Sequence, residues 1–170
     1  MSVKEHKNNQ LSVNCMIITV SDTRTDKTDK SGNLMVKLLE QAGHRIVLKE
    51  IVPDERSAIK NMIDTGRNNQ DVDVILTNGG TGVSFRDVTI ETIKNMLDKE
   101  MSGFGELFRM LSYQEDIGSA AILSRALAGV SNHTVIFATP GSSGAVKLAM
   151  NKLILPELSH TVKEVKKDIE

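Results

Sequence analysis

The segment VDVILTNGGTGVSFRD, residues 72–87, joins a short apolar run to a glycine-rich turn that ends in an aspartate. The run Val72–Leu76 is rich in β-branched residues and apolar except for Asp73, which is typical of a strand buried on both faces. Gly79-Gly-Thr-Gly82 predicts a tight turn, and Asp87 can begin a helix because an apolar stripe with helical spacing follows it. A strand, a turn and a helix in this order form the repeating unit of a parallel α/β sheet.

The same unit recurs along the chain. Three more apolar runs predict strands at Cys15–Val20, Ile46–Val52 and Thr134–Ala138. The predicted helices begin near Ser31, Asp54, Asp87 and Phe104, cover residues 119–128 and 145–149, and end with a helix whose first residue is Pro156. The alternation predicts an α/β fold with a mostly parallel sheet and helices on both of its faces.

Composition limits the class of protein. A chain of 170 residues suits one domain, which we place at residues 13–170, after a flexible N-terminal arm at residues 1–12. Aromatic residues are 3% of the chain and the net charge is −1, so we expect no nucleic-acid partner. No apolar stretch is long enough to span a membrane and no signal peptide is evident, so we expect a cytoplasmic protein. Cys15, the one cysteine, lies in an apolar run and is expected to be a buried strand thiol.

Ligands of open parallel sheets bind at the carboxyl ends of the strands. Three junctions of that kind are rich in small or polar residues: 20–32, 78–87 and 138–144. Small residues leave backbone N–H groups uncovered, so these junctions predict sites for anionic groups. The charged run at residues 26–30 within the first junction is expected to be a mobile, hydrated loop.

Familiar phosphate-binding templates do not fit. The glycine turn lacks the lysine of a Walker loop and the third glycine of a dinucleotide fingerprint. Asp54 and Asp87 each follow a predicted strand, and each can be either a helix cap or, with substrate phosphates, a ligand of Mg²⁺. Arg125 lies in an apolar stretch, where it can bind a phosphate or lie at a subunit contact.

An ordered set of motifs resembles the molybdopterin-binding family, which includes molybdopterin adenylyltransferases. The set covers the chain from about residue 13 to its end. Its motifs are Ser21–Arg24, Val52–Asp54, Thr77–Gly82, Arg86–Glu91, Gly103–Arg109, Leu123–Ala126 and Pro140–Ser142.

The resemblance implies a three-layer α/β domain that binds molybdopterin. It also implies transfer of AMP from ATP to the terminal phosphate of molybdopterin, with Mg²⁺ as cofactor and pyrophosphate as second product. Asp54 and Asp87 correspond to the family's catalytic and metal-binding acidic positions. The implied cofactor-binding residues are Ser21, Asp22, Thr77, Gly79, Gly80, Thr81, Gly82, Arg125, Pro140, Gly141, Ser142 and Ser143.

The resemblance also carries alternatives. The family has hexameric and trimeric branches, so it implies a homohexamer, with a trimer as the alternative, and partners among other molybdenum cofactor biosynthesis proteins. Residues 103–109 and 123–126 resemble a branch in which some members lack clear adenylyltransferase activity. The alternative function is therefore a non-catalytic molybdopterin carrier or assembly protein.

Overall fold

A six-stranded sheet runs through the centre of the computed structural model, which describes residues 11–169. The strand order is β2-β1-β3-β6-β5-β4. The pairs β1·β2, β1·β3 and β3·β6 are parallel, whereas β5·β6 and β4·β5 are antiparallel. The strands are β1 (Asn14–Val20), β2 (Arg45–Val52), β3 (Val74–Asn78), β4 (Lys99–Glu100), β5 (Leu127–Ser131) and β6 (Thr134–Thr139).

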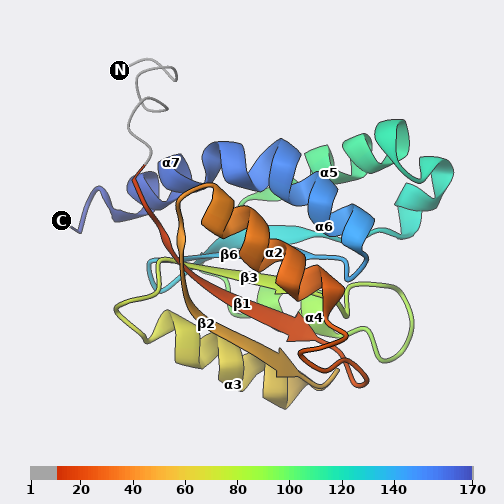
Figure 1. Ribbon diagram of the computed structural model, residues 1–170, viewed down its shortest axis with the longest axis horizontal. Helices are drawn as coiled ribbons and strands as arrows, with labels where there is room; N and C mark the ends of the chain where they lie inside the picture. Colours follow the sequence, from red (N-terminus) through yellow and green to blue (C-terminus); the bar gives the residue numbers. More distant parts are fainter. Residues whose placement is uncertain (1–10, 170) are drawn as a thin grey trace.

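Helices cover both faces of the sheet (Figure 1). One face is covered by α2 (Lys30–Gln41), α5 (Ser102–Glu115), α6 (Ser143–Ala149) and α7 (Leu155–Lys166). The other is covered by α3 (Arg56–Arg67) and α4 (Thr89–Lys94). The predicted fold class, a mostly parallel sheet between two helical layers, is confirmed.

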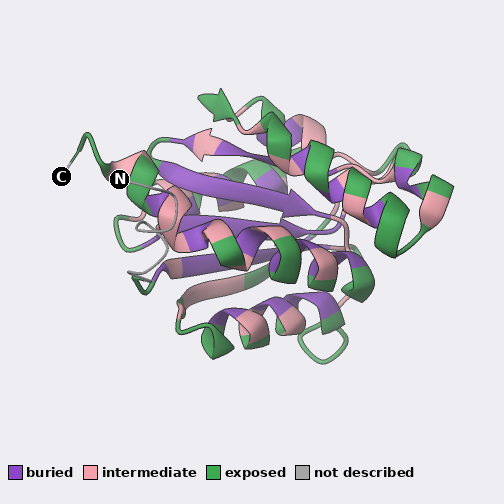
Figure 2. Cartoon of the chain, turned by 90° about the horizontal axis from the view of Figure 1, so that it is seen from above, coloured by how far each residue is buried: buried purple, intermediate pink, exposed green. Residues whose placement is uncertain are grey.

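Two hydrophobic cores, one on each face, explain why the central strands are mostly apolar. In β1, Cys15 and Ile17 pack into the core under α2 and α6, while Met16 and Ile18 pack into the core under α3. Successive side chains of a strand point to opposite faces. The strands β1, β3 and β6 are correspondingly the most buried part of the chain (Figure 2). Cys15 is a buried free thiol, as predicted, and burial raises its pKa to about 12.

The register aligns the carboxyl ends of four parallel strands. Thr19 of β1 lies beside Asn78 of β3, and Asn78 lies beside Thr139 of β6. Val20 lies beside Val52 of β2. The loops that follow these strands therefore leave the sheet along one edge, where the sequence predicts ligand binding.

Helices α2, α3 and α4 begin near the predicted positions, but Ser31, Asp54 and Asp87 do not cap them. The side chain of Asp29 caps α2 by accepting a hydrogen bond from the N–H of Gly32, and Ser31 lies inside the helix. Helix α3 begins after Glu55 and α4 after Val88, so neither Asp54 nor Asp87 is an N-cap. Their carboxylates are engaged elsewhere, as described below.

The predicted helix at residues 119–128 is also wrong. Residues Gly118–Leu123 form a short 3₁₀ helix, η1, and β5 begins at Leu127. β5 and β6 are joined by Asn132 and His133, whose φ angles of 48° and 63° are those of a tight hairpin turn. The run Leu127–Val130 is apolar enough for either helix or strand, and pairing with β6 decides the outcome.

Pro156 does not begin a separate helix. A π-helical turn, η2 (Met150–Ile154), joins α6 to α7, and the N–H of Leu155 donates to the carbonyl of Met150. Pro156 is the second residue of α7, where its missing N–H is tolerated because the π turn has already shifted the hydrogen-bond pattern.

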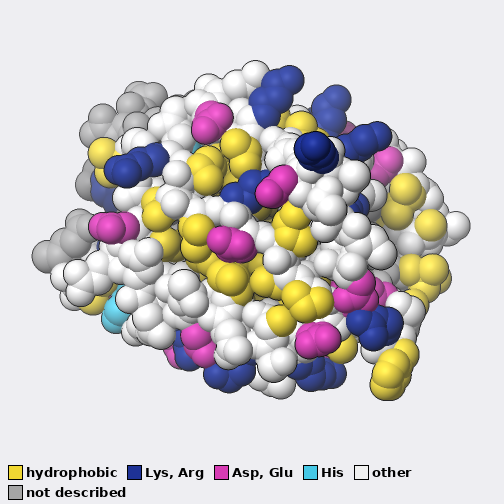
Figure 3. Space-filling model, turned by 60° about the horizontal axis from the view of Figure 1, so that its bottom comes forward, with side chains coloured by type: hydrophobic (Ala, Val, Ile, Leu, Met, Phe, Trp, Pro, Cys, Tyr) yellow, Lys and Arg dark blue, Asp and Glu magenta, His cyan; other side chains and the backbone are white. Residues whose placement is uncertain are grey.

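The predicted arm at residues 1–12 lies outside the described residues except for Leu11 and Ser12. The carbonyl of Leu11 accepts a hydrogen bond from Ser159 of α7 (2.8 Å), and the hydroxyl of Ser12 donates to the carbonyl of Gly43 (2.9 Å). None of the described helices is long and apolar enough to cross a membrane. On the face that carries α3, charged side chains of both signs lie among exposed hydrophobic ones (Figure 3).

Candidate functional site

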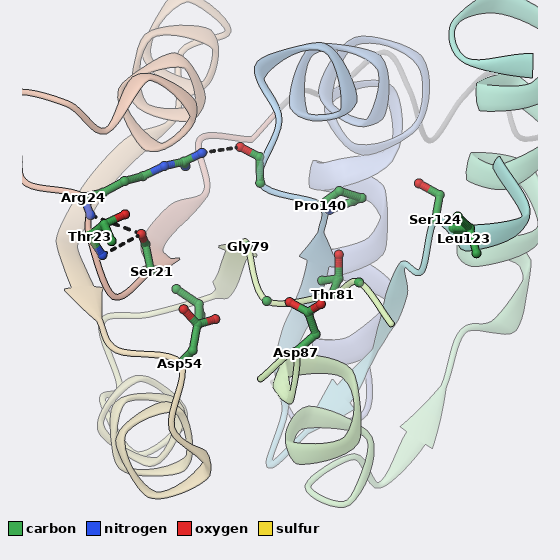
Figure 4. A pocket seen from close by; sticks show the side chains of 14 residues that line it. Ser21, Thr23, Arg24, Asp54, Gly79, Thr81, Asp87, Leu123, Ser124 and Pro140 are labelled. Atoms are coloured by element: carbon green, nitrogen blue, oxygen red, sulfur yellow. Dashed lines mark hydrogen bonds between the residues drawn. The ribbon is translucent and has the colours of Figure 1, made fainter. Parts of the chain in front are cut away.

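Loops that follow β1, β2, β3 and β6 surround a pocket of about 430 Å³ (Figure 4). The chain reverses at the end of each strand, so residues far apart in sequence meet there. The lining residues are Val20, Ser21, Thr23, Arg24, Asp54, Gly79, Gly80, Thr81, Gly82, Asp87, Leu123, Ser124, Pro140 and Gly141.

The glycine turn after β3 can be formed only by glycines at its first two positions. Gly79 and Gly80 have φ angles of +97° and +67°, in the left-handed region. A Cβ on Gly79 would lie 2.2 Å from the carbonyl oxygen of Val20, and one on Gly80 would lie 2.3 Å from Oγ1 of Thr89. The turn therefore lies directly against the end of β1 and the start of α4.

The carbonyl groups of this turn are bound from outside the pocket. Thr89 donates its Oγ1–H to the carbonyl of Gly79 (2.9 Å) and its N–H to that of Gly80 (3.0 Å). Arg125 donates Nε–H to the carbonyl of Thr81 (2.9 Å) and Nη2–H to that of Gly82 (2.6 Å). Among residues 11–169, the N–H groups of Gly80, Thr81 and Gly82 have no protein acceptor. These free donors on pocket-lining residues can bind an anionic oxygen.

Glu91 holds Arg125 in place. Its carboxylate forms an ion pair with Nη1 of Arg125, and the hydrogen bond from this guanidinium holds the pKa of Glu91 below its ordinary value. Arg125 is not among the residues that line the pocket. Its hydrogen bonds and its ion pair are with the turn and with Glu91, so it positions the turn.

Asp54 lies on the loop after β2 and is joined to Asp22 on the loop after β1. The N–H of Asp54 donates to Oδ1 of Asp22 (3.0 Å), and the N–H of Asp22 donates to Oδ2 of Asp54 (3.2 Å). Burial raises the pKa of Asp54 above its ordinary value, and the charges of Asp22 and Asp87 raise it further. The hydrogen bond from the N–H of Asp54 and those from Arg86 instead lower the pKa of Asp22.

Asp87 closes the loop that carries the glycine turn. Its Oδ2 accepts hydrogen bonds from the N–H (3.0 Å) and the hydroxyl (2.5 Å) of Ser84. A Cβ on Gly82 would lie 2.6 Å from the same oxygen, so glycine at position 82 makes room for the carboxylate. Asp54 and Asp87 both line the pocket, as the sequence predicts. In Figure 4 they extend from different loops on the same side of it.

Asp54 and Asp87 fit the group that the family resemblance implies. Carboxylate oxygens are ligands that Mg²⁺ accepts, and Mg²⁺ commonly combines one or two of them with substrate phosphates. Burial is the first cause of the raised pKa of Asp54, and the negative charges of Asp22 and Asp87 add to it; a bound cation would offset these charges. Among residues 11–169 there is no group of three or more His, Cys, Asp or Glu side chains placed to hold a metal ion.

The loop at residues 21–29 is ordered by specific hydrogen bonds. The hydroxyl of Ser21 accepts the N–H groups of Thr23 (3.2 Å) and Arg24 (3.1 Å). The expectation of a mobile, hydrated run at residues 26–30 is wrong for Asp29, because this carboxylate is fully buried. It accepts a hydrogen bond from Thr19 (2.8 Å) and forms an ion pair with Lys49 (3.0 Å).

Nine of the predicted site residues come together in the pocket: Ser21, Asp54, Gly79, Gly80, Thr81, Gly82, Asp87, Pro140 and Gly141. The others do not line it. Thr77 is fully buried in β3, and its hydroxyl has no hydrogen-bond partner within the described chain. Ser142 caps α6 by accepting the N–H of Ala145 (3.2 Å), and Ser143 is the first residue of that helix. Asp22 and Arg125 contact lining residues instead: Asp22 is hydrogen-bonded to Asp54, and Arg125 to the carbonyl of Thr81 in the turn.

The sequence-based site did not include the lining residues Val20, Thr23, Arg24, Leu123 and Ser124. All but Val20 lie in the motifs Ser21–Arg24 and Leu123–Ala126, which were the signal for them. Leu123 ends the 3₁₀ helix that the sequence predicted as α-helix, and Ser124 follows it.

Comparisons with known proteins give a consistent result. A family model described as "Probable molybdopterin binding domain" matches residues 16–160. Molybdenum cofactor biosynthesis protein B of Bacillus subtilis is 62% identical over 169 residues, covering 99% of this chain and 99% of that protein.

Solved structures agree with the sequence comparisons. A crystal structure of a molybdenum cofactor biosynthesis protein B is 57% identical, with a TM-score of 0.91 over 92% of this chain and 98% of that one. The tungsten cofactor synthesizing protein of Pyrococcus furiosus is 37% identical, with a TM-score of 0.78 over 92% of this chain and 99% of that one.

Proposed function

The chain belongs to the molybdopterin-binding family and has a role in molybdenum cofactor biosynthesis, and from this premise we propose that it is a molybdopterin adenylyltransferase. In the proposed reaction, an oxygen of the terminal phosphate of molybdopterin attacks the α-phosphorus of ATP. The bond from this phosphorus to the oxygen that bridges to the β-phosphate breaks. Pyrophosphate leaves with the bonding electrons, and adenylylated molybdopterin is the second product.

The nucleophile of this reaction needs no general base. A phosphate monoester is largely ionised at neutral pH, because its second pKa is about 6. The residues that line the pocket include no histidine, and the proposed chemistry requires none. It requires instead that two anionic groups be aligned and their charge neutralised.

The observation that carries the proposal is the meeting of the glycine turn with Asp54 and Asp87 in one pocket. The free N–H groups of the turn can bind phosphate oxygens, and Arg125 and Thr89 keep the turn rigid from behind. We propose that Asp54 and Asp87 hold Mg²⁺ together with the phosphates of the substrate. Bound Mg²⁺ would neutralise phosphate charge during the transfer.

We also propose that the chain forms a homohexamer, with a trimer as the alternative. The support is a group of exposed apolar side chains on α5 and η1 that one copy leaves uncovered. Leu107, Met110 and Tyr113 of α5 and Ile122 and Leu123 of η1 are between 46% and 83% exposed. Light scattering on the purified protein tests this proposal.

Purified protein with ATP, Mg²⁺ and molybdopterin tests the proposed reaction. An adenylyltransferase yields adenylylated pterin and pyrophosphate in equal amounts. Binding of molybdopterin without either product, and without Mg²⁺-dependent binding of ATP, would instead identify a carrier.

A further inference from the structure

We propose that Arg24 is the side chain that binds a phosphate group of the ligand in this pocket. The inference deepens the proposed function, since it rests on a phosphate-bearing ligand, but it does not require that AMP be transferred. The sequence suggested Arg125 for a ligand contact, and the structure gives Arg125 and Arg24 different surroundings.

Arg24 is the one Lys or Arg among the residues that line the pocket, within the described part of the chain. The other ionisable lining residues are Asp54 and Asp87. An anionic ligand in a pocket with two carboxylates needs a compensating positive charge, and Arg24 supplies it from the protein. Arg86 and Arg125 are already paired with Asp22 and Glu91.

The guanidinium of Arg24 is held in a fixed position across the top of the pocket. Its Nη2–H donates to the carbonyl of Gly141 (2.8 Å), and its Nη1–H donates to Oδ1 of Asn78 (3.5 Å). Figure 4 shows it extending from the first loop to the loop after β6. The hydroxyl of Ser31 donates to the same Gly141 carbonyl (2.5 Å), which fixes that acceptor in turn. A charged group fixed before the ligand arrives loses little entropy on binding.

The charge of Arg24 is only partly offset. Nη1 lies 3.6 Å from Oδ1 of the buried Asp29, but Lys49 lies closer to that carboxylate, at 3.0 Å. Two cations thus share one buried anion, and of the two only Arg24 lines the pocket. Lys49 also lies 3.5 Å from the carboxylate of Asp26, which is 92% exposed and so offsets its charge only weakly.

Arg24 also has donors to spare. A guanidinium carries five N–H groups in a planar fork that matches two oxygens of a phosphate. The two hydrogen bonds to Gly141 and Asn78 use two of them, and Nη1 also faces Asp29. The side chain is 29% exposed and lines the pocket, so a ligand in the pocket can reach it.

Direct binding measurements on Arg24→Gln test this inference. Titration calorimetry would measure four ligands: ATP with Mg²⁺, adenosine, molybdopterin and dephosphorylated molybdopterin. We expect Arg24→Gln to bind at least one of the two phosphate-bearing ligands about tenfold to a hundredfold more weakly than the parent does. Adenosine and the dephosphorylated pterin should bind as they do to the parent. The pair that changes identifies whether the phosphate belongs to the nucleotide or to the pterin.

Two further variants keep the test decisive. Arg24→Lys keeps the charge but loses the planar fork of N–H donors. Its affinity for the phosphate-bearing ligand should therefore lie between those of the parent and Arg24→Gln. Arg45→Gln removes the same charge at the end of β2 that is remote from the pocket, so all four ligands should bind to it with the affinity of the parent. Equal binding of both phosphate ligands by Arg24→Gln and the parent overturns the inference. The inference is also overturned if Arg24→Gln loses affinity equally for ligands with and without phosphate. It is overturned as well if the parent binds neither ATP nor molybdopterin. The parent could form no adenylylated pterin while Arg24→Gln still binds a phosphate-bearing ligand more weakly. That result would refute the proposed reaction but leave the role of Arg24 standing.

Discussion

Arg86 on the loop after β3 and Asp22 on the loop after β1 form an ion pair that joins two walls of the pocket. Nε and Nη2 of Arg86 donate to the same oxygen of Asp22, at 2.9 and 2.5 Å. The N–H of Asp22 is in turn bonded to the carboxylate of Asp54. A contact between two exposed side chains therefore fixes the position of an acidic residue inside the site.

Arg86→Gln should loosen the loop that carries the glycine turn without unfolding the protein. Phe85, next to Arg86, is 99% exposed, so cleavage by chymotrypsin after Phe85 reports on the mobility of this loop. We expect faster cleavage in Arg86→Gln and, because the pair is exposed, faster cleavage of the parent in high salt. Arg56→Gln, on the first residue of α3, is the matched control and should be cleaved like the parent. Equal cleavage rates for Arg86→Gln and the parent would show that the pair does not restrain the loop.

Gly82→Ala should abolish turnover while leaving most of the stability. The added Cβ would lie 2.6 Å from Oδ2 of Asp87 and push the carboxylate out of its hydrogen bonds with Ser84. Because the loop is near the surface, we expect a loss of less than about 2 kcal/mol in the free energy of unfolding. Urea unfolding and the rate of pyrophosphate release measure the two effects.

Gly103→Ala is the control for that substitution. A Cβ on Gly103 would meet no atom within 4 Å, and the residue lies in α5. Alanine is the better helix former, so stability should rise by up to about 1 kcal/mol with unchanged turnover. Full turnover in Gly82→Ala would mean that the position of the Asp87 carboxylate does not matter.

Asp29 should make the stability of the protein depend on pH. Burial alone would raise its pKa, but hydrogen bonds from Lys49, Thr19 and the N–H of Gly32 outweigh burial and lower the pKa below its ordinary value. As the pH falls, the unfolded chain therefore takes up this proton first, at its ordinary pKa of about 3.9. The stabilisation is present above about pH 4 and is lost as the pH falls through the folded pKa.

Asp29→Asn tests this dependence. At neutral pH we expect it to be less stable than the parent by about 3–5 kcal/mol, because Lys49 loses its buried partner. The difference should shrink below about pH 4 in urea unfolding measured across the pH range. Asp26→Asn, whose carboxylate is exposed, should stay within about 0.5 kcal/mol of the parent throughout. A difference for Asp29→Asn that is as large at about pH 3 as at neutral pH would contradict this account.

The centre of the parallel sheet was predictable because β1, β3 and β6 are buried on both faces. The sequence predicts a strand at Val72–Leu76 from its β-branched, mostly apolar composition, although the observed strand begins two residues later, after Asp73, and ends at Asn78. The antiparallel edge was not predictable. β4 has only two residues, both exposed, and β5 turns into β6 through Asn132 and His133, which lack the usual glycine of such turns.

The backbone of the site was predictable, but the side chains that organise it were not. The glycine turn and the loop after β6 were visible as small residues after strands. Arg24 contacts Gly141, 117 positions away in sequence, and Arg125 contacts Gly82, 43 positions away. Local patterns carry no information about such pairs. The burial of Asp29 was missed because its neighbours in sequence are charged, while its contacts Thr19 and Lys49 come from two strands.

The most direct test of the proposed reaction is the rate at which Asp54→Asn and Asp87→Asn form adenylylated molybdopterin from ATP and Mg²⁺. Both substitutions preserve shape and remove a charge from the pocket, so thermal unfolding should confirm that each variant is folded. We predict product formation by the parent and a loss of at least about a hundredfold in each variant. A folded variant that adenylylates molybdopterin at the parent rate, or a parent that forms no product with saturating substrates, would contradict the proposal.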